Sequence, residues 1–477
     1  MTSPPTATIS RREMLQRSAC GFGSIALAGL CRDSSLLADS SNPLVAKPGH
    51  LPAKAKRVIF IFMQGGPSHV DSFDYKPKLL ANHLNKVDVL GYRFDDFRKM
   101  TKRTMMKPLW DFHRYGQSGR AVSDLFPETA KHVDDLCFLH GMHTEGIAHG
   151  PATLFLHTGS VNQVRPSVGS WVSYGLGSEN ENMPAFVSLM PTERMGGPQN
   201  YGNAFLPAIH QGTAIGKAEQ AIDDVKIANI SNALMSEATQ RGQFNLMQQL
   251  NRAQAKASPN DDNVEATINA FELAYRMQMN APGLSDLSRE TDATKKIYGI
   301  GEKDTDAFGR QCLMARRMAE SGVRYIQVNY SDNHGGNPRW DQHSNMPKHA
   351  QHAKAVDKPV AGLLQDLKSR GLLEDTLVWW GGEFGRTPFS QNNDGRDHNP
   401  HGFTVWLAGA GVKPGVAYGA TDEWGYMAVQ NKVHMHDLHA TVLHLLGLNH
   451  EQLTYRFAGR DFRLTDVYGK VVRDIIA

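Results

Sequence analysis

Apolar runs separated by glycine-rich polar stretches recur along the chain. The runs at residues 57–63 (RVIFIFM) and 376–380 (TLVWW) are continuous and rich in β-branched or aromatic side chains, which is typical of strands buried on both faces. We expect further strands at residues 134–142, 183–190, 322–330 and 403–409. Between two of these strands, residues 356–367 carry an apolar stripe at helical spacing.

This alternation predicts an α/β fold with a mainly parallel central sheet and helices on both faces. Residues 215–320 are polar with helical periodicity and are predicted to form a helical insertion, and residues 455–472 are predicted to add a small C-terminal β unit. We divide the chain into a signal and processing region at 1–40, a Pro/Lys linker at 41–56 and one domain at 57–477.

The amino terminus has the pattern of an export signal. Arg11 and Arg12 precede a short, weakly apolar run at residues 18–30, too short to span a bilayer. This pattern resembles a twin-arginine signal, with Met14 and Gln16 in place of the usual Phe and Lys. It predicts a periplasmic or extracellular protein with no integral membrane segment.

Composition narrows the function classes. The net charge of +3 is small and no Lys/Arg block stands beside aromatic residues, so nucleic acid is not an expected partner. Only Cys137 and Cys312 lie beyond the predicted signal, too few for a disulfide framework. The 21 histidines are unusual because many stand in clusters beside Asp and Gly, a pattern that favours a metal site.

Polar groups follow four predicted strands, at the edge where open α/β sheets bind ligands. The four segments lie at residues 64–77, 140–159, 330–345 and 381–403. Each alone could be an ordinary turn or a structural ion pair, but together they predict one functional edge. Ser68 and Thr153 are alternative nucleophiles in these segments, with His69 as a possible base for Ser68.

The order of these segments resembles that of the alkaline phosphatase and sulfatase superfamily. The motifs WDQH (340–343), DTLVWWGGEFG (375–385) and RDHNPHGFTVWLAG (396–409) reproduce the second half of that order, and HGPATLFLHTG (149–159) resembles the sulfatase nucleophile signature. More closely, residues 55–470 resemble a twin-arginine-exported bacterial family of unknown function, common in planctomycete-type organisms. Its hallmarks here include GGPSHVDSFDYKP, GGEFGRTP and HDLHATVLHLLG.

The resemblance implies a metal-dependent site, but with departures. Gln64 replaces the superfamily's first Asp, His149 stands at the Cys, Ser or Thr nucleophile position, and Glu383-Phe384 replaces an Asp-His pair. The implied catalytic residues are His149, Glu383 and Arg386. The implied ligands of a divalent metal (Zn, Mn or Ca) are Asp341, His343, Glu383, His398, His401 and Asp71. The implied anion-binding residues are Arg386, Arg396, Ser68 and His69.

These observations predict an extracytoplasmic hydrolase of phosphate or sulfate esters, acting on a small molecule or a polysaccharide. A bound metal would activate water, with His149 or Glu383 taking its proton. The alternative is a non-catalytic sulfatase-like protein that binds an anionic glycan or a partner protein, because the usual nucleophile is missing. A structural role in a surface complex is a third possibility.

Overall fold

The computed structural model describes residues 44–91, 99–180, 182–220, 286–333 and 338–477, with a few positions between 236 and 250. Leu44–Ala477 form one compact unit. The predicted export signal, most of the predicted helical insertion and His334 lie outside the described residues. The final part of residues 215–320 forms α9 (Asp292–Ile297) and α10 (Asp306–Glu320).

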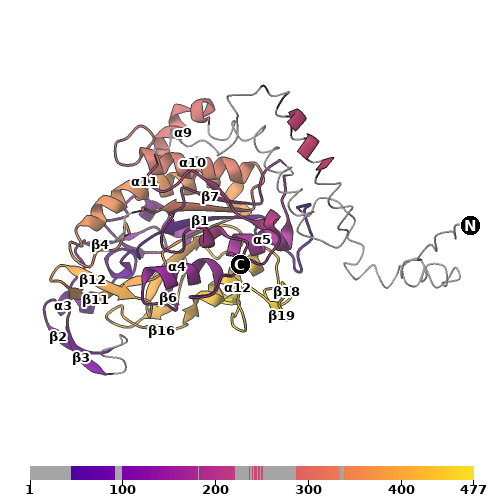
Figure 1. The fold of residues 1–477 in the computed structure, drawn as a ribbon. Helices are drawn as coiled ribbons and strands as arrows, with labels where there is room; N and C mark the ends of the chain where they lie inside the picture. Colours follow the sequence, from indigo (N-terminus) through magenta and orange to yellow (C-terminus); the bar gives the residue numbers. More distant parts are fainter. Residues whose placement is uncertain are drawn as a thin grey trace, which may run out of the picture. The chain divides into compact units, whose positions relative to one another are not determined.

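A nine-stranded sheet runs through the middle of this unit (Figure 1). Its strands follow the order β14 (Ala417–Tyr418), β6 (Leu136–His143), β13 (Phe403–Ala408), β10 (Thr376–Gly381), β1 (Arg57–Met63), β9 (Tyr325–Tyr330), β7 (Phe186–Leu189) and β8 (Thr213–Ile215), while β17 (Val433–His434) pairs with β6. The central strand β1 is parallel to both β10 and β9. The exception is β13, which is antiparallel to β10 and β6.

Helices cover both faces of the sheet (Figure 1). On one face α10 and α11 (Lys348–Ser369) pack with Ile59, Ile61 and Val328. On the other face, apolar residues of α4 (His149–Thr158), α5 (Val168–Leu176) and α12 (Met435–Leu445) pack with Phe60 and Phe62. Alternate side chains of β1 thus enter opposite cores, as expected for a strand buried on both sides.

Short hairpins surround the sheet. They are β2 (Lys86–Leu90) with β3 (Met100–Thr104), β4 (Phe112–Tyr115) with β5 (Arg120–Ser123), β11 (Gly385–Gln391) with β12 (Gly395–Asn399), β15 (Ala420–Thr421) with β16 (Ala428–Gln430), and β18 (Tyr455–Phe457) with β19 (Arg460–Phe462). The β11–β12 hairpin follows β10 directly and carries site residues. The β18–β19 hairpin is the small C-terminal β unit expected from the sequence.

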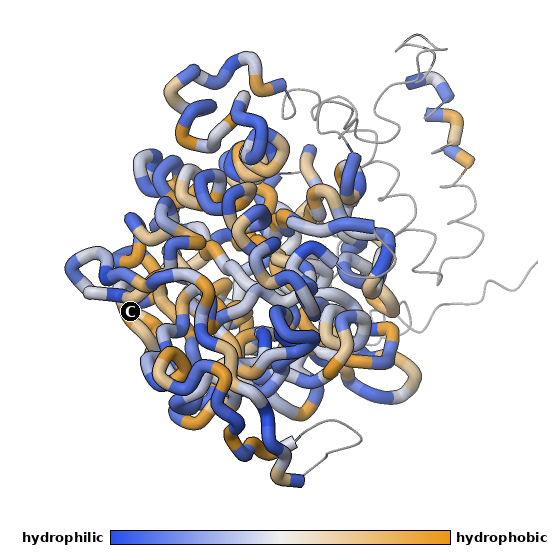
Figure 2. Tube along the Cα trace, turned by 90° about the vertical axis from the view of Figure 1, so that its left-hand side faces the viewer, coloured by the Kyte–Doolittle hydropathy of each residue, from blue (hydrophilic) through white to orange (hydrophobic). Residues whose placement is uncertain are grey.

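The predicted fold class is therefore confirmed: a mainly parallel central sheet with helices on both faces. Within the described ranges, no helix has the length and apolar character that a membrane crossing needs. Hydrophobic and hydrophilic positions are accordingly mixed along these helices (Figure 2).

Candidate metal centre

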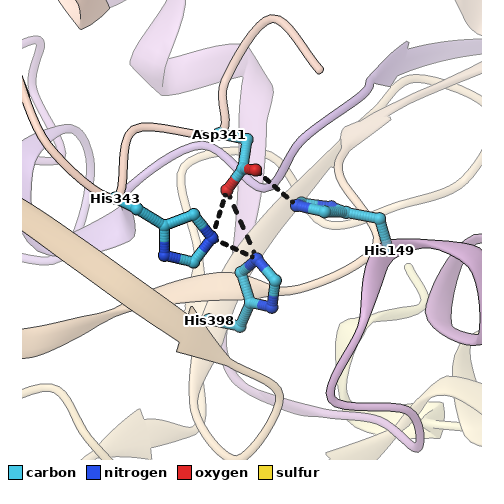
Figure 3. A group of neighbouring side chains, drawn as sticks. All are labelled: His149, Asp341, His343 and His398. Carbon is cyan, nitrogen blue, oxygen red and sulfur yellow. Dashed lines mark hydrogen bonds and ion pairs between the residues drawn. The ribbon is translucent and has the colours of Figure 1, made fainter. Parts of the chain in front are cut away.

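Three histidines and one aspartate converge beyond the carboxyl ends of the central strands (Figure 3). His149 is the first residue of α4, and His398 lies in β12. Asp341 and His343 lie in the loop between β9 and α11. Four ligand atoms, one from each residue, all lie within 4.8 Å of one another.

The cluster is organised around the Asp341 carboxylate. Its Oδ2 lies 3.1 Å from His149 Nε2. Its Oδ1 lies 2.9 Å from His343 Nε2 and 3.3 Å from His398 Nε2. The two imidazole Nε2 atoms of His343 and His398 are 3.0 Å apart. All three imidazoles thus present the same nitrogen to the carboxylate.

The other nitrogen of each imidazole has its own acceptor. His149 Nδ1 lies 2.6 Å from Glu383 Oε1, and His343 Nδ1 lies 2.5 Å from Gln391 Oε1. His398 Nδ1 donates to the Ile147 carbonyl at 2.7 Å. A hydrogen bond from Nδ1–H leaves Nε2 as the lone-pair nitrogen of a neutral imidazole, which is how proteins orient metal-binding histidines.

In these tautomers, hydrogen-bond acceptor atoms of the cluster face other acceptor atoms. With Nδ1 as donor and no proton on Nε2, the rings of His343 and His398 direct lone pairs at each other and at Asp341 Oδ1. Burial, followed by the charge of Arg386, lowers the pKa of His398 to about 4 despite its contact with Asp341, so this imidazole stays neutral near pH 7. A cation bound between these atoms would turn the facing lone pairs into ligands.

Charge within the cluster is tightly coupled. Burial acts to raise the pKa of Asp341, but its contacts with the three imidazoles and the charge of Arg386 outweigh burial and hold that pKa well below its usual range. Burial likewise acts to lower the pKa of His149, yet its bonds to Asp341 and Glu383 raise it above 6.5. The raised pKa of His149 reflects its two carboxylate neighbours, which also favour a bound cation.

The donor set fits a divalent metal. A tetrahedral zinc ion with bonds of about 2.0–2.1 Å separates its ligand atoms by about 3.4 Å, close to the 2.9–3.3 Å between Asp341 Oδ1 and the facing imidazole nitrogens. Three nitrogens and one carboxylate oxygen suit zinc or manganese better than calcium, which prefers oxygen ligands. His343 and His398 are partly exposed, so one side of the cluster is open to solvent.

Glu383 supports the cluster from the end of β10. Its two carboxylate oxygens accept from the backbone N–H of Gly65, at 3.0 and 3.1 Å, and Oε1 also faces His149. The side chain is fully buried. Phe384, the next residue, lines the cluster with its ring, whose centroid lies 5.0 Å from that of His149 and 4.5 Å from that of His398.

Arg386 is buried behind Asp341. It donates to Asp341 Oδ1 at 2.6 Å. The same nitrogen, Nη2, also donates to the Gly65 carbonyl, while Nε and Nη1 donate to the carbonyls of Gly66 and Arg396. Arg386 thus stabilises the carboxylate from the protein side, and its side chain has no exposed surface.

The remaining predicted site residues lie outside the cluster of four. Asp71 and Arg396 form a fully buried ion pair at 2.7 Å, and Arg396 also donates to the carbonyls of Met106, Lys107 and Thr387. Ser68 Oγ donates to Asp71 at 2.5 Å, and His69 Nε2 lies 2.7 Å from the Gly425 carbonyl.

His401 lies beyond the end of β12, and burial lowers its pKa to about 4. Thr153, one helical turn after His149, is fully buried. The roles assigned to these residues from the sequence stay predictions. Gln391 and the Ile147 carbonyl, which orient two of the histidines, were not anticipated, because neither a lone glutamine nor a backbone group gives a sequence signal.

The chain belongs to the family described as "Protein of unknown function (DUF1501)", whose model matches residues 55–476. No curated protein matches it significantly. The fold is similar to the lipoteichoic acid synthase LtaP of Listeria monocytogenes (10% identity, 88% of this chain and 78% of that one, TM-score 0.38). It is also similar to the sulfatase PsFucS1 of Pseudoalteromonas sp., with 12% sequence identity over 83% of this chain and 68% of that chain and a TM-score of 0.35. A third similar structure is an alkaline phosphatase superfamily protein of Vibrio parahaemolyticus, with 9% sequence identity over 88% of this chain and 74% of that chain and a TM-score of 0.33.

Proposed function

We propose that this protein is a hydrolase of phosphate or sulfate esters that uses one divalent metal ion, with zinc as the first candidate and manganese as the second. The observation that carries the proposal is the common orientation of His149, His343 and His398. Each directs Nε2 at Asp341 and Nδ1 at an acceptor. Such an arrangement is what a metal-binding histidine set needs.

A metal ion at this position would polarise an ester oxygen and make a water molecule acidic enough to attack near neutral pH. The residues around the cluster position its histidines and exclude water from its buried side. Glu383 is a positioning residue in this proposal, because its buried carboxylate contacts His149 and Gly65 rather than solvent. His149 Nε2, next to Asp341 Oδ2, is a metal ligand in this proposal rather than a proton acceptor.

Two features favour a water-based route over a covalent one. His149 stands at the position where the resemblance places the Cys, Ser or Thr nucleophile. Ser68, a possible nucleophile in the sequence, donates its hydroxyl hydrogen to the buried carboxylate of Asp71. Both observations support a reaction in which water is the nucleophile.

The test is an assay of the purified full chain with aryl phosphates and aryl sulfates. Turnover should appear after loading with Zn²⁺ or Mn²⁺ and should disappear after chelation. A His149→Gln variant that still folds should lose most of this turnover. Absence of turnover on both ester classes with a metal-loaded protein would contradict the proposal.

The second candidate is a non-catalytic protein that binds an anionic glycan or a partner protein through the same cleft. It is favoured by the presence of His149 at the position where the resemblance places a nucleophile. This candidate predicts that His149→Ala leaves ligand binding nearly unchanged while no ester is turned over.

We also propose export by the twin-arginine route to the periplasm or the extracellular space. The support is the paired Arg11 and Arg12 ahead of a short apolar run. Replacement of both arginines by lysine should leave the protein in the cytoplasm, as measured by cell fractionation.

A further inference from the structure

A second pocket lies between the β4–β5 hairpin, strand β6 and the segment that follows β1. Its space of about 260 Å³ is slightly smaller than the roughly 300–1,000 Å³ of sites for drug-sized ligands, so it suits a single small unit. Its lining residues are distinct from the four residues of the metal centre. Aromatic, cationic and anionic side chains all contribute to its wall.

Two arginines of the hairpin give this pocket a positive charge. Arg114 of β4 donates from Nη1 to the Gly119 carbonyl at 2.9 Å. Arg120 of β5 donates from Nε to the Gly415 carbonyl at 3.1 Å. Within the described residues, these uncharged acceptors are the only hydrogen-bond or ion-pair partners of the two guanidiniums. Because a guanidinium has five N–H donors, each of them keeps donors and charge for a ligand.

The carboxylate of Asp74 lines the same pocket but has a cation of its own. It forms an ion pair with Lys76 at 3.1 Å and accepts from Thr421 Oγ1 at 2.5 Å. Lys76 thus balances the charge of Asp74, and the charge of the two arginines stays uncompensated. A carboxylate offers about four lone-pair positions, so Asp74 can also accept from a ligand hydroxyl.

Aromatic rings and a histidine complete the wall. Tyr75 is 39% exposed, and its ring packs against Phe112 with the centroids 5.1 Å apart, which fixes the ring while leaving surface for a ligand. The His140 ring stacks on Phe138, and its Nδ1 lies 3.0 Å from Thr404 Oγ1. Burial lowers the pKa of His140, so the imidazole is neutral near pH 7 and can form a hydrogen bond with a hydroxyl through Nε2.

This combination of groups matches one class of ligand. Guanidiniums bind a carboxylate or a sulfate through charge-assisted hydrogen bonds. Asp74 and His140 suit hydroxyl groups, and the face of an aromatic ring suits the C–H groups of a sugar. An inorganic anion would use only the arginines, whereas an acidic sugar would use every part of the wall.

We propose that the pocket binds one acidic sugar unit, a sugar ring that carries a carboxylate or a sulfate, with Arg114 and Arg120 holding the anionic group and Tyr75 packing on the ring. This binding site is separate from the proposed ester hydrolysis and needs no metal ion. On an anionic polysaccharide it would act as a second attachment point, which raises the overall affinity for the polymer.

The test is a titration of the full chain, observed by ligand NMR, with glucuronate, a glucose sulfate and glucose as separate probes. The variants are Arg114→Gln, which removes one charge, and Tyr75→Ala, which removes the aromatic face. Arg456→Gln is the matched control, because Arg456 is an exposed arginine of another hairpin, β18–β19. Every protein is titrated both metal-loaded and after chelation, and its thermal unfolding is measured.

We expect at least one acidic sugar to bind about 10- to 100-fold more tightly than glucose, the range of a charge-assisted hydrogen bond. Arg114→Gln should remove most of this difference, Tyr75→Ala should weaken binding of all three probes, and Arg456→Gln should match the wild type. The preferred acidic sugar identifies the anionic group as a carboxylate or a sulfate. Equal affinity for glucose and both acidic sugars, equal effects of Arg114→Gln and Arg456→Gln, or no binding would overturn the inference. Loss of binding on chelation would also overturn it, because the sugar would then lie at the metal centre, whereas absence of esterase activity alone contradicts only the proposed function.

Discussion

At the scale of single residues, Glu383 explains how a carboxylate can be useful without touching solvent. It is fully buried, yet its oxygens are satisfied by the Gly65 N–H and by His149 Nδ1. A carboxylate in this position makes the facing imidazole a better metal ligand and fixes its tautomer. The charge of Glu383 therefore acts on the metal centre through His149.

Replacement of Glu383 by glutamine should weaken metal binding. Loss of a carboxylate behind a metal-binding histidine typically costs about 10- to 100-fold in affinity, and we expect a loss in this range. The measurement is a competition titration of Zn²⁺ against a chelator of known affinity. Glu145→Gln serves as the control, because Glu145 is exposed and lies in the loop before α4. Unchanged affinity in Glu383→Gln would exclude a role for Glu383 in the centre.

At the scale of elements, the metal centre depends on the close approach of β1 and β10 at their carboxyl ends. A Cβ atom on Gly382 would lie 2.8 Å from the Met63 carbonyl oxygen and 2.7 Å from Pro67 Cδ. Only glycine fits there without moving backbone atoms, and the same approach brings Gly65 within hydrogen-bond distance of Glu383. The glycines after β10 thus position the acid that follows them.

A Gly382→Ala change should therefore destabilise the protein and weaken metal binding together. We expect a loss of about 1–3 kcal/mol in the free energy of unfolding, as for other overpacked sites, measured by urea denaturation. Gly150→Ala is the control, because a Cβ on Gly150 meets nothing within 4 Å and alanine favours the helix. If Gly382→Ala were as stable as Gly150→Ala, close approach of the two strands would not be required.

Strong apolar runs made the central sheet predictable. The run at residues 57–63 coincides with β1, and the runs at 376–380 and 403–409 mark β10 and β13. The direction of β13 could not be predicted from the sequence, because its antiparallel pairing is set by its neighbours β10 and β6. The β11–β12 hairpin was also missed, because its polar residues carry no apolar alternation and, apart from the Met105–Phe389 bridge, its two strands pair only with each other.

Helix α11 shows the same limit. The apolar stripe at residues 356–367 identified its second half, whereas the helix begins at Lys348. The first turns contain His349 and His352, which are buried against Trp340. Histidines on a buried helix face do not give a hydrophobic pattern, so packing in the folded protein decides the start of this helix.

For the candidate site, the sequence named all four clustered residues but not their mutual geometry. Asp341, His343 and His398 were expected as ligands, and His149 as a catalytic residue. The sequence could not show that the side chains of Arg386 and Arg396 are buried, because their burial results from contacts between distant segments.

At the scale of the whole molecule, buried histidines make stability depend on pH. His210 is 3% exposed and its Nδ1 lies 2.9 Å from Ser173 Oγ. Burial, together with the charge of Lys47, lowers its pKa to about 3 from 6.5. The unfolded chain therefore binds a proton that the folded protein does not, so the stabilising contribution is complete above pH 6.5 and is lost as pH falls toward 3.

Replacement of His210 should make the free energy of unfolding less sensitive to acid. Between pH 7 and pH 5, His210 alone should lower the free energy of unfolding of the wild type by about 2 kcal/mol. In the His210→Gln variant the decrease should be smaller by that amount. The measurement is urea denaturation at the two pH values. His113→Gln, at an exposed position of β4, should behave as the wild type. An identical pH dependence in His210→Gln and the wild type would contradict the prediction.

The most direct test of the account is elemental analysis of the purified full chain beside a His343→Ala/His398→Ala double variant and a His401→Ala control. We predict about one divalent metal ion per chain, as a four-ligand site requires, in the wild type and in His401→Ala, and none in the double variant. A wild type without bound metal after incubation with Zn²⁺ and Mn²⁺, or a double variant that retains its metal, would contradict it.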